Sequence, residues 1–175
     1  MLKNIITVSL IFFITSGIFS CAEKQKETDP TDKQVNELLA KMSVEEKVGQ
    51  MTQVTIDLIL KDNSATDVDL QKLRTAIVDK KVGSILNVKG RAYSINEWHQ
   101  LLNAIQKVAL EETPNKIPVI YGIDAIHGAN YIQNATLFPH NIGMAATRNE
   151  KIVKEGAIVT TLETRASGIR WNFDP

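Results

Sequence analysis

The chain has a single cysteine and no excess of either charge, and each of these features excludes a class of function. One cysteine among 175 residues cannot build a disulfide framework or a cysteine-rich zinc site. Lysine plus arginine and aspartate plus glutamate number 20 each, so the formal net charge is zero. This balance argues against a nucleic-acid-binding protein, because such proteins need clustered positive charge to displace counterions from phosphates.

Motifs that hold nucleotides or build common hydrolase sites are also absent. The sequence has no Gly-x-Gly-x-x-Gly run, no Walker A loop, no nucleophile elbow and no His-Glu-x-x-His. We therefore expect no nucleotide cofactor, and nothing in the sequence implies another cofactor. Apolar residues make up 43% of the chain and charged residues 23%, which is typical of a globular enzyme or binding domain.

The N-terminal residues have the pattern of an export signal. Lys3 precedes an apolar run over residues 5–19, which is shorter than the roughly 20 residues that a membrane-spanning helix needs. Cys21 follows almost directly, and this stretch resembles the lipobox of bacterial lipoproteins. We expect residues 1–20 to be a lipoprotein signal peptide, Cys21 to be lipidated and residues 21–34 to be a polar tether. An ordinary signal peptide with a free cysteine is the alternative.

From about Asp32 onward, helical and strand patterns alternate. Helices are expected over residues 32–42, 43–51, 67–80, 94–112 and 149–166. Strands are expected within 51–60 and over 83–88, 117–122 and 168–173. Such alternation implies parallel strands joined by helical crossovers, as found in a doubly wound sheet or a (β/α) barrel. A complete barrel needs about 250 residues, so we expect this chain to supply about half of one and to be truncated.

The segment over residues 121–130 has the strongest functional pattern. Asp124 lies just past the strand expected over 117–122, and parallel α/β folds bind ligands at the carboxyl ends of their strands. Its carboxylate can accept hydrogen bonds from two neighbouring hydroxyls, which suits a sugar. It can equally cap the following turn. The residues alone favour neither interpretation.

A metal site is a further hypothesis for this region, with His127, His140 and Asp124 as ligands. Gly128 and the polar residues after it argue against the helix that would align Asp124 with His127, so we predict no metal site. His140 follows Phe138 and Pro139 and is expected to hydrogen-bond locally within a loop.

Three other polar side chains invite structural rather than catalytic predictions. His99 is expected to be a partly exposed helix residue. Glu163 and Arg165 lie near the end of the last helix, where they would form either an interior ion pair or a solvated edge. The solvated edge is the default for such residues.

Two runs, IPVIYGIDAIHGAN at residues 117–130 and ATLFPHNIGMAATRN at 135–149, are very similar to glycoside hydrolase family 3. The similarity is greatest to the β-glucosidase and exo-β-glucanase branch. Residues 38–51 match the opening helices of that family, and residues 155–175 match its next helix and strand. The resemblance covers residues 35–175, with separate blocks in the right order.

This resemblance implies that residues 35–175 form part of a (β/α)8 barrel domain in a retaining enzyme. Such an enzyme removes terminal β-D-glucosyl residues from the non-reducing ends of β-glucosides. Asp124 matches the family aspartate that holds hydroxyls of the glucosyl unit at the −1 subsite. The nucleophilic aspartate and the acid/base glutamate fall beyond residue 175, so no catalytic residue is expected within this chain. Glu46, Glu163 and Asp174 match no catalytic position.

The expected partners are a β-glucoside or oligosaccharide, the missing part of the barrel with the second domain, and a bacterial membrane reached through the lipid on Cys21. The protein would then be exported, to the periplasm or the cell surface. The fragment alone is expected to be inactive. The alternative is a non-catalytic sugar-binding lipoprotein that retains Asp124. Against it stands the open edge of a half-barrel, which would expose unpaired backbone groups and apolar side chains.

Overall fold

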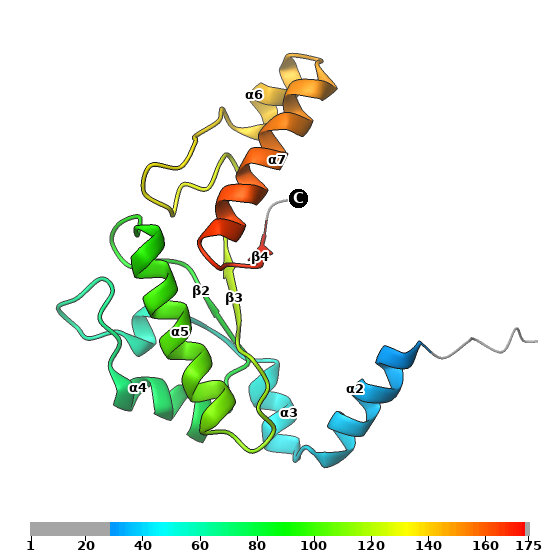
Figure 1. Ribbon diagram of the computed structural model, residues 1–175, viewed down its shortest axis with the longest axis vertical. Helices are drawn as coiled ribbons and strands as arrows, with labels where there is room; N and C mark the ends of the chain where they lie inside the picture. The colour runs from blue at the N-terminus through cyan, green and yellow to red at the C-terminus, as the bar shows by residue number, and fades with distance from the viewer. Residues whose placement is uncertain (1–28, 174–175) are drawn as a thin grey trace, which may run out of the picture. The chain divides into compact units, whose positions relative to one another are not determined.

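The structure, a computed structural model, describes residues 29–173 (Figure 1). The expected signal peptide and Cys21 lie outside the described residues. The chain divides into two units, one ending at Glu37 and the other beginning at Leu38, and each is described by itself. Among the described residues, no helix is long and apolar enough to cross a membrane.

Helix α2 (Pro30–Lys41) begins inside the segment that the sequence analysis assigned to the tether. The backbone N–H of Thr31 donates to the Asp29 carboxylate at 2.8 Å, so Asp29 satisfies a free donor at the helix start. Pro30 occupies the first helical position, where its missing N–H costs nothing. This start signal precedes the first apolar residue of the helix, and a search for apolar periodicity therefore overlooks it.

Within the second unit, helices and strands alternate largely as predicted. The elements after α2 are α3 (Val44–Gln50), β1 (Gln53–Thr55), η1 (Ile56–Ile59), α4 (Leu70–Arg74), η2 (Thr75–Asp79), β2 (Ser84–Leu86), α5 (Ile95–Glu111), β3 (Ile120–Ile123), α6 (Asn141–Ala146), α7 (Glu150–Ala166) and β4 (Trp171–Asn172). The short 3-10 helix η1 follows β1, and η2 is a π-helical turn that continues α4. Helix α6 was not predicted, because it is short and no side chain caps it.

The four strands form one parallel sheet in the order β1-β2-β3-β4. Each strand therefore lies beside the strand that precedes it in the chain. A doubly wound sheet reverses its strand order at a switch point, and the described sheet contains no reversal. The order is that of a (β/α) barrel. The structure therefore favours the barrel over the doubly wound sheet, the two architectures that the sequence left open.

Helix α5 lies beside the sheet and packs against β3 (Figure 1). Trp98 of α5 is fully buried, and its ring centroid lies 5.4 Å from that of Tyr121 on β3. The Trp98 indole N–H also donates to the carbonyl of Tyr131 at 3.1 Å. Trp98 thus joins the helix to the sheet and to the segment that follows β3.

The opposite face of the sheet is less covered. Side chains alternate along a strand, so Tyr121 and Ile123 face the helices whereas Ile120 and Gly122 face the other way. Ile123 is completely buried, but Ile120 is 54% exposed. In a closed barrel this second face lines the interior, and its carboxyl end surrounds the site.

The start of α5 is held by a capping box formed by Ser94 and Glu97. Ser94 Oγ accepts a hydrogen bond from the Glu97 N–H, and Glu97 Oε2 accepts one from the Ser94 N–H at 2.8 Å. Arg91 donates to both Glu97 oxygens, at 2.6 and 3.1 Å. The Arg91 guanidinium and the Ser94 backbone lower the pKa of Glu97 to about 2.

The low pKa of Glu97 makes its contribution to stability pH-dependent. Because folding depresses this pKa, the contribution is complete above about pH 4.5, the ordinary value, and is lost as the pH falls through about 2. We expect Glu97→Gln to destabilise the fold at pH 7 and by a smaller amount at pH 3. Urea unfolding at both pH values measures this, with Glu111→Gln, an exposed change at the other end of α5, as control. An equal loss at both pH values would contradict the assignment.

Candidate functional site

Asp124 follows β3 directly and begins a segment, residues 124–138, that we call the Asp124 loop. Asp124 is half-buried, and no described residue donates a hydrogen bond to its carboxylate. It therefore does not cap the following turn, which was one of the two interpretations left open. By strand alternation it falls on the face of Ile120 and Gly122, at the carboxyl end of the sheet. None of the hydrogen bonds within residues 29–173 occupies either oxygen of this carboxylate, so both can accept one from a ligand.

The end of β4 holds the backbone on either side of Asp124. The N–H of Phe173 donates to the carbonyl of Ile123 at 3.0 Å. The N–H of Ala125, a fully buried residue, donates to Asn172 Oδ1 at 2.8 Å. Asn172 lies 47 residues further along the chain, so no local sequence pattern could have identified this contact.

The Asp124 loop folds back on itself at Gly128. The N–H of Phe138 donates to the carbonyl of His127 at 2.8 Å, and Gly128 pairs with Leu137. Gly128 has a φ of +106°, and a Cβ atom there would lie 2.1 Å from the carbonyl oxygen of Thr136. The two segments of the loop approach each other so closely here that position 128 requires glycine.

Glu163 of helix α7 holds the Asp124 loop by two hydrogen bonds to Thr136. The two Glu163 oxygens accept hydrogen bonds from the N–H and the hydroxyl of Thr136, each at 2.9 Å. Arg165 is exposed, and the described residues show no ion pair between it and Glu163. Of the two predicted alternatives, the interior ion pair is therefore wrong, and the solvated edge is the one that fits: Arg165 is exposed and the Glu163 carboxylate makes exposed hydrogen bonds to the neighbouring loop.

The rings of two histidines pack against each other at the Asp124 loop. The rings of His127 and His140 lie against each other with centroids 4.6 Å apart and planes tilted by 57°. Within residues 29–173, no three metal-ligating side chains come together. His140 hydrogen-bonds locally through its carbonyl, which accepts from the N–H of Met144 at 3.1 Å, whereas its side chain makes no capping bond to α6. His99 is exposed, as predicted, and its Nε2 lies 2.9 Å from the carbonyl of Ala166.

Tyr131 is a member of the Asp124 loop that the sequence analysis did not single out. Burial raises the pKa of the Tyr131 hydroxyl, and the negative charge of Asp124 raises it further. The phenol therefore stays protonated at neutral pH and near the carboxylate. Its backbone carbonyl accepts hydrogen bonds from Trp98 Nε1 and from the N–H of Tyr93 at 3.0 Å, so this part of the loop is fixed to the core.

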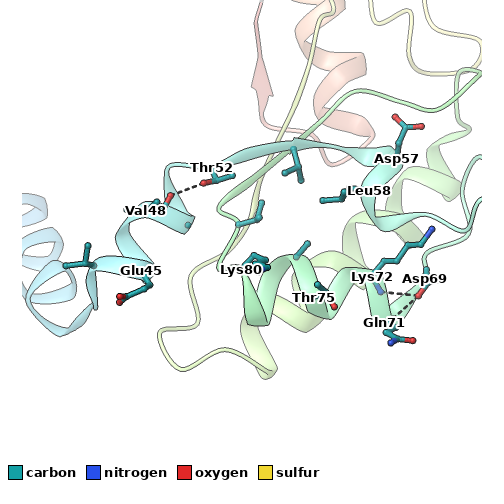
Figure 2. Close-up of a pocket in the computed structure, with 15 residues that line it drawn as sticks. Glu45, Val48, Thr52, Asp57, Leu58, Asp69, Gln71, Lys72, Thr75 and Lys80 are labelled. Carbon is teal, nitrogen blue, oxygen red and sulfur yellow. Dashed lines mark hydrogen bonds between the residues drawn. The ribbon is translucent and has the colours of Figure 1, made fainter.

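A separate groove of about 1150 Å³ lies beside the edge strand β1 (Figure 2). Helix α3 supplies one wall, and α4 with η2 supplies the other. Its apolar side chains include Val48 and Leu58, which are 54% and 52% exposed. The Asp69 carboxylate in its wall is occupied by the N–H groups of Gln71 and Lys72, which it caps. No aromatic ring lines the groove among the described residues, and its walls are typical of a packing surface.

Comparison with known proteins is consistent with this geometry. Residues 43–175 match the family described as "Glycosyl hydrolase family 3 N terminal domain". A "Lysosomal beta glucosidase" from Dictyostelium discoideum is 42% identical over 151 residues, which are 81% of this chain and 18% of that protein. The chain thus spans less than a fifth of the length of this relative.

Solved structures of the same family share the fold. The β-glucosidase from Listeria innocua in complex with isofagomine superposes with a TM-score of 0.60 at 26% identity, over 82% of this chain and 18% of the other. A family 3 β-N-acetylglucosaminidase from Paenibacillus superposes with a TM-score of 0.62 at 25% identity, over 77% of this chain and 24% of the other. The sequence match, the strand order and these superpositions agree. The chain belongs to glycoside hydrolase family 3 and carries residues of its N-terminal, barrel-type domain.

Proposed function

We propose that this chain is the N-terminal part of a β-glucosidase in which Asp124 binds the terminal glucosyl unit. The observation that carries the proposal is the half-buried Asp124 carboxylate, which follows β3 and receives no hydrogen bond from the described residues. A carboxylate whose oxygens are both open can accept two short hydrogen bonds from vicinal hydroxyls. The similarity to a lysosomal β-glucosidase and to the Listeria innocua enzyme supports glucose as the sugar.

The proposed reaction is hydrolysis of a terminal β-D-glucosyl bond with retention of configuration. Retention needs two carboxyl groups about 5–5.5 Å apart, one as nucleophile and one as acid/base. We propose that both belong to parts of the whole enzyme beyond residue 175, and that Asp124 binds and orients the sugar. The groove beside β1 supports the proposal that further parts of the enzyme complete the barrel. Additional strand–helix units would cover the apolar walls of this groove.

We also propose that the enzyme is exported and held on a bacterial membrane by lipid on Cys21. The leader-like pattern of residues 1–20 and the cysteine that follows it support this proposal. Cys21→Ser should move the protein from the membrane fraction to the soluble fraction, whereas the neighbouring change Ser20→Ala should not. Equal membrane retention of both variants would contradict lipidation at Cys21.

The activity is tested on the whole enzyme with three aryl glycosides that differ only in the sugar. We expect kcat/KM to be highest for the β-D-glucoside, ahead of the N-acetyl-β-D-glucosaminide and the β-D-xyloside, and the first sugar released to be β-glucose by proton NMR. Preference for either of the other sugars, or α-glucose as the first product, would contradict the proposal. Glucose binding without any hydrolysis would favour a sugar-binding lipoprotein instead.

A further inference from the structure

The hydrogen bond from Ala125 to Asn172 replaces a bond that the sheet would otherwise make. Ile123 pairs with Asn172 in the parallel register, and Phe173 N–H donates to the Ile123 carbonyl. A regular parallel ladder would continue with the Ala125 N–H donating to the Phe173 carbonyl. Here the Asn172 side-chain oxygen accepts that proton at 2.8 Å instead. The chain can therefore leave the sheet after Asp124 without leaving a buried donor unpaired.

Asp124 is thus bracketed by two hydrogen bonds that its neighbours make with Asn172 of β4 and with Phe173, the residue after this strand. One reaches Ile123 before it, and the other reaches Ala125 after it. The described residues make no hydrogen bond to the Asp124 carboxylate itself. The direction of the carboxylate therefore depends on its backbone, and the backbone depends on β4. The Ala125 side chain is completely buried, so the position of this residue is further fixed by packing.

We propose that Asn172 is a positioning residue for Asp124. The proposal rests on the function of Asp124 proposed above. A displacement of about 1 Å at a site that orients substrate can cost about 100-fold in rate. Without the Asn172 oxygen, the Ala125 N–H would lose its hydrogen-bond acceptor. The backbone at Asp124 could then rotate. Asn172 would then act on catalysis through Asp124 without touching the sugar.

Two substitutions of nearly equal size test this role. Asn172→Asp keeps the acceptor oxygen at the same place, whereas Asn172→Leu removes it. We expect Asn172→Leu to lower kcat/KM of the whole enzyme for an aryl β-glucoside at least tenfold, and Asn172→Asp to stay within about threefold of the wild type. Equal effects of the two variants would overturn the proposal.

A double-mutant cycle separates positioning from a general loss of stability. If Asn172 acts through Asp124, Asn172→Leu should lower kcat/KM less than twofold further in an Asp124→Asn background. An undiminished tenfold loss in that background would show a merely structural role and would overturn the proposal. If Asn172→Leu does not fold, Asn172→Ser takes its place, because its shorter side chain leaves Ala125 without the acceptor.

The same cycle distinguishes failure of this inference from failure of the proposed function. If Asp124→Asn alone leaves kcat/KM unchanged, Asp124 does not bind the sugar, and the proposed function fails together with the inference. If Asp124→Asn is strongly impaired while Asn172→Leu behaves as the wild type, only the positioning role of Asn172 fails.

Discussion

Replacing Asp124 with asparagine is expected to lower kcat/KM of the whole enzyme for an aryl β-glucoside by about 100-fold or more. A hydrogen bond to a charged group contributes about 1.5–3 kcal/mol to binding. In the proposed complex the Asp124 carboxylate accepts two such bonds from the sugar. The amide of asparagine keeps the shape of the side chain but offers one acceptor in place of two. Because part of the binding energy is realised only in the transition state, kcat should fall and KM should rise.

The fold itself should tolerate Asp124→Asn. No described residue donates to the Asp124 carboxylate, so its replacement breaks no hydrogen bond among residues 29–173. Thermal unfolding of the variant should therefore match that of the wild type. Asp57→Asn is the matched control, because Asp57 is an exposed aspartate in the wall of the groove beside β1. A loss below threefold for Asp124→Asn, or an equal loss for Asp57→Asn, would contradict the role of Asp124.

Replacing Gly128 with alanine is expected to destabilise the fold by about 2–5 kcal/mol. The change combines a positive φ, which costs about 1–2 kcal/mol for a residue with a side chain, with overpacking, which costs about 1–3 kcal/mol. The added Cβ would lie 2.1 Å from the Thr136 carbonyl oxygen, and a backbone atom cannot swing away as a flexible side chain can. The Asp124 loop would have to open, so kcat/KM should fall as well.

Gly90→Ala separates the two costs at Gly128. Gly90 also has a positive φ, +75°, but nothing lies within 4 Å of the Cβ atom that the change would add. This variant should therefore lose only the conformational cost, about 1–2 kcal/mol, and should keep its activity. Urea unfolding of both variants measures the difference. Equal losses of stability would show that the contact with Thr136 does not constrain the loop.

Local sequence patterns predicted most elements of the barrel segment because these elements are specified locally. Ser43, Ser94 and Asn149 each cap a helix through backbone groups two or three residues away. The apolar stripe of α5 is visible in the sequence for the same reason. The start of α2 at Pro30 was missed because its signal is a capping aspartate before a proline and carries no apolar period.

The contacts that shape the site join residues far apart in the sequence. The spacing of apolar residues along the chain cannot predict such contacts. Glu163 reaches Thr136 across 27 residues, and Asn172 reaches Ala125 across 47. The choice between a doubly wound sheet and a barrel likewise needed the spatial order of the strands. Asp124 could be placed at a strand end from the pattern alone, but the resemblance to glycoside hydrolase family 3 was needed to favour a sugar over a turn cap.

The most direct test of the account is a crystal structure of the whole enzyme with glucose bound. We expect the Asp124 carboxylate to accept hydrogen bonds from two sugar hydroxyls at about 2.5–3.0 Å. The bonds from Phe173 to Ile123 and from Ala125 to Asn172 should be present in the same structure. Glucose bound away from Asp124, for example in the groove beside β1, would contradict the central claim.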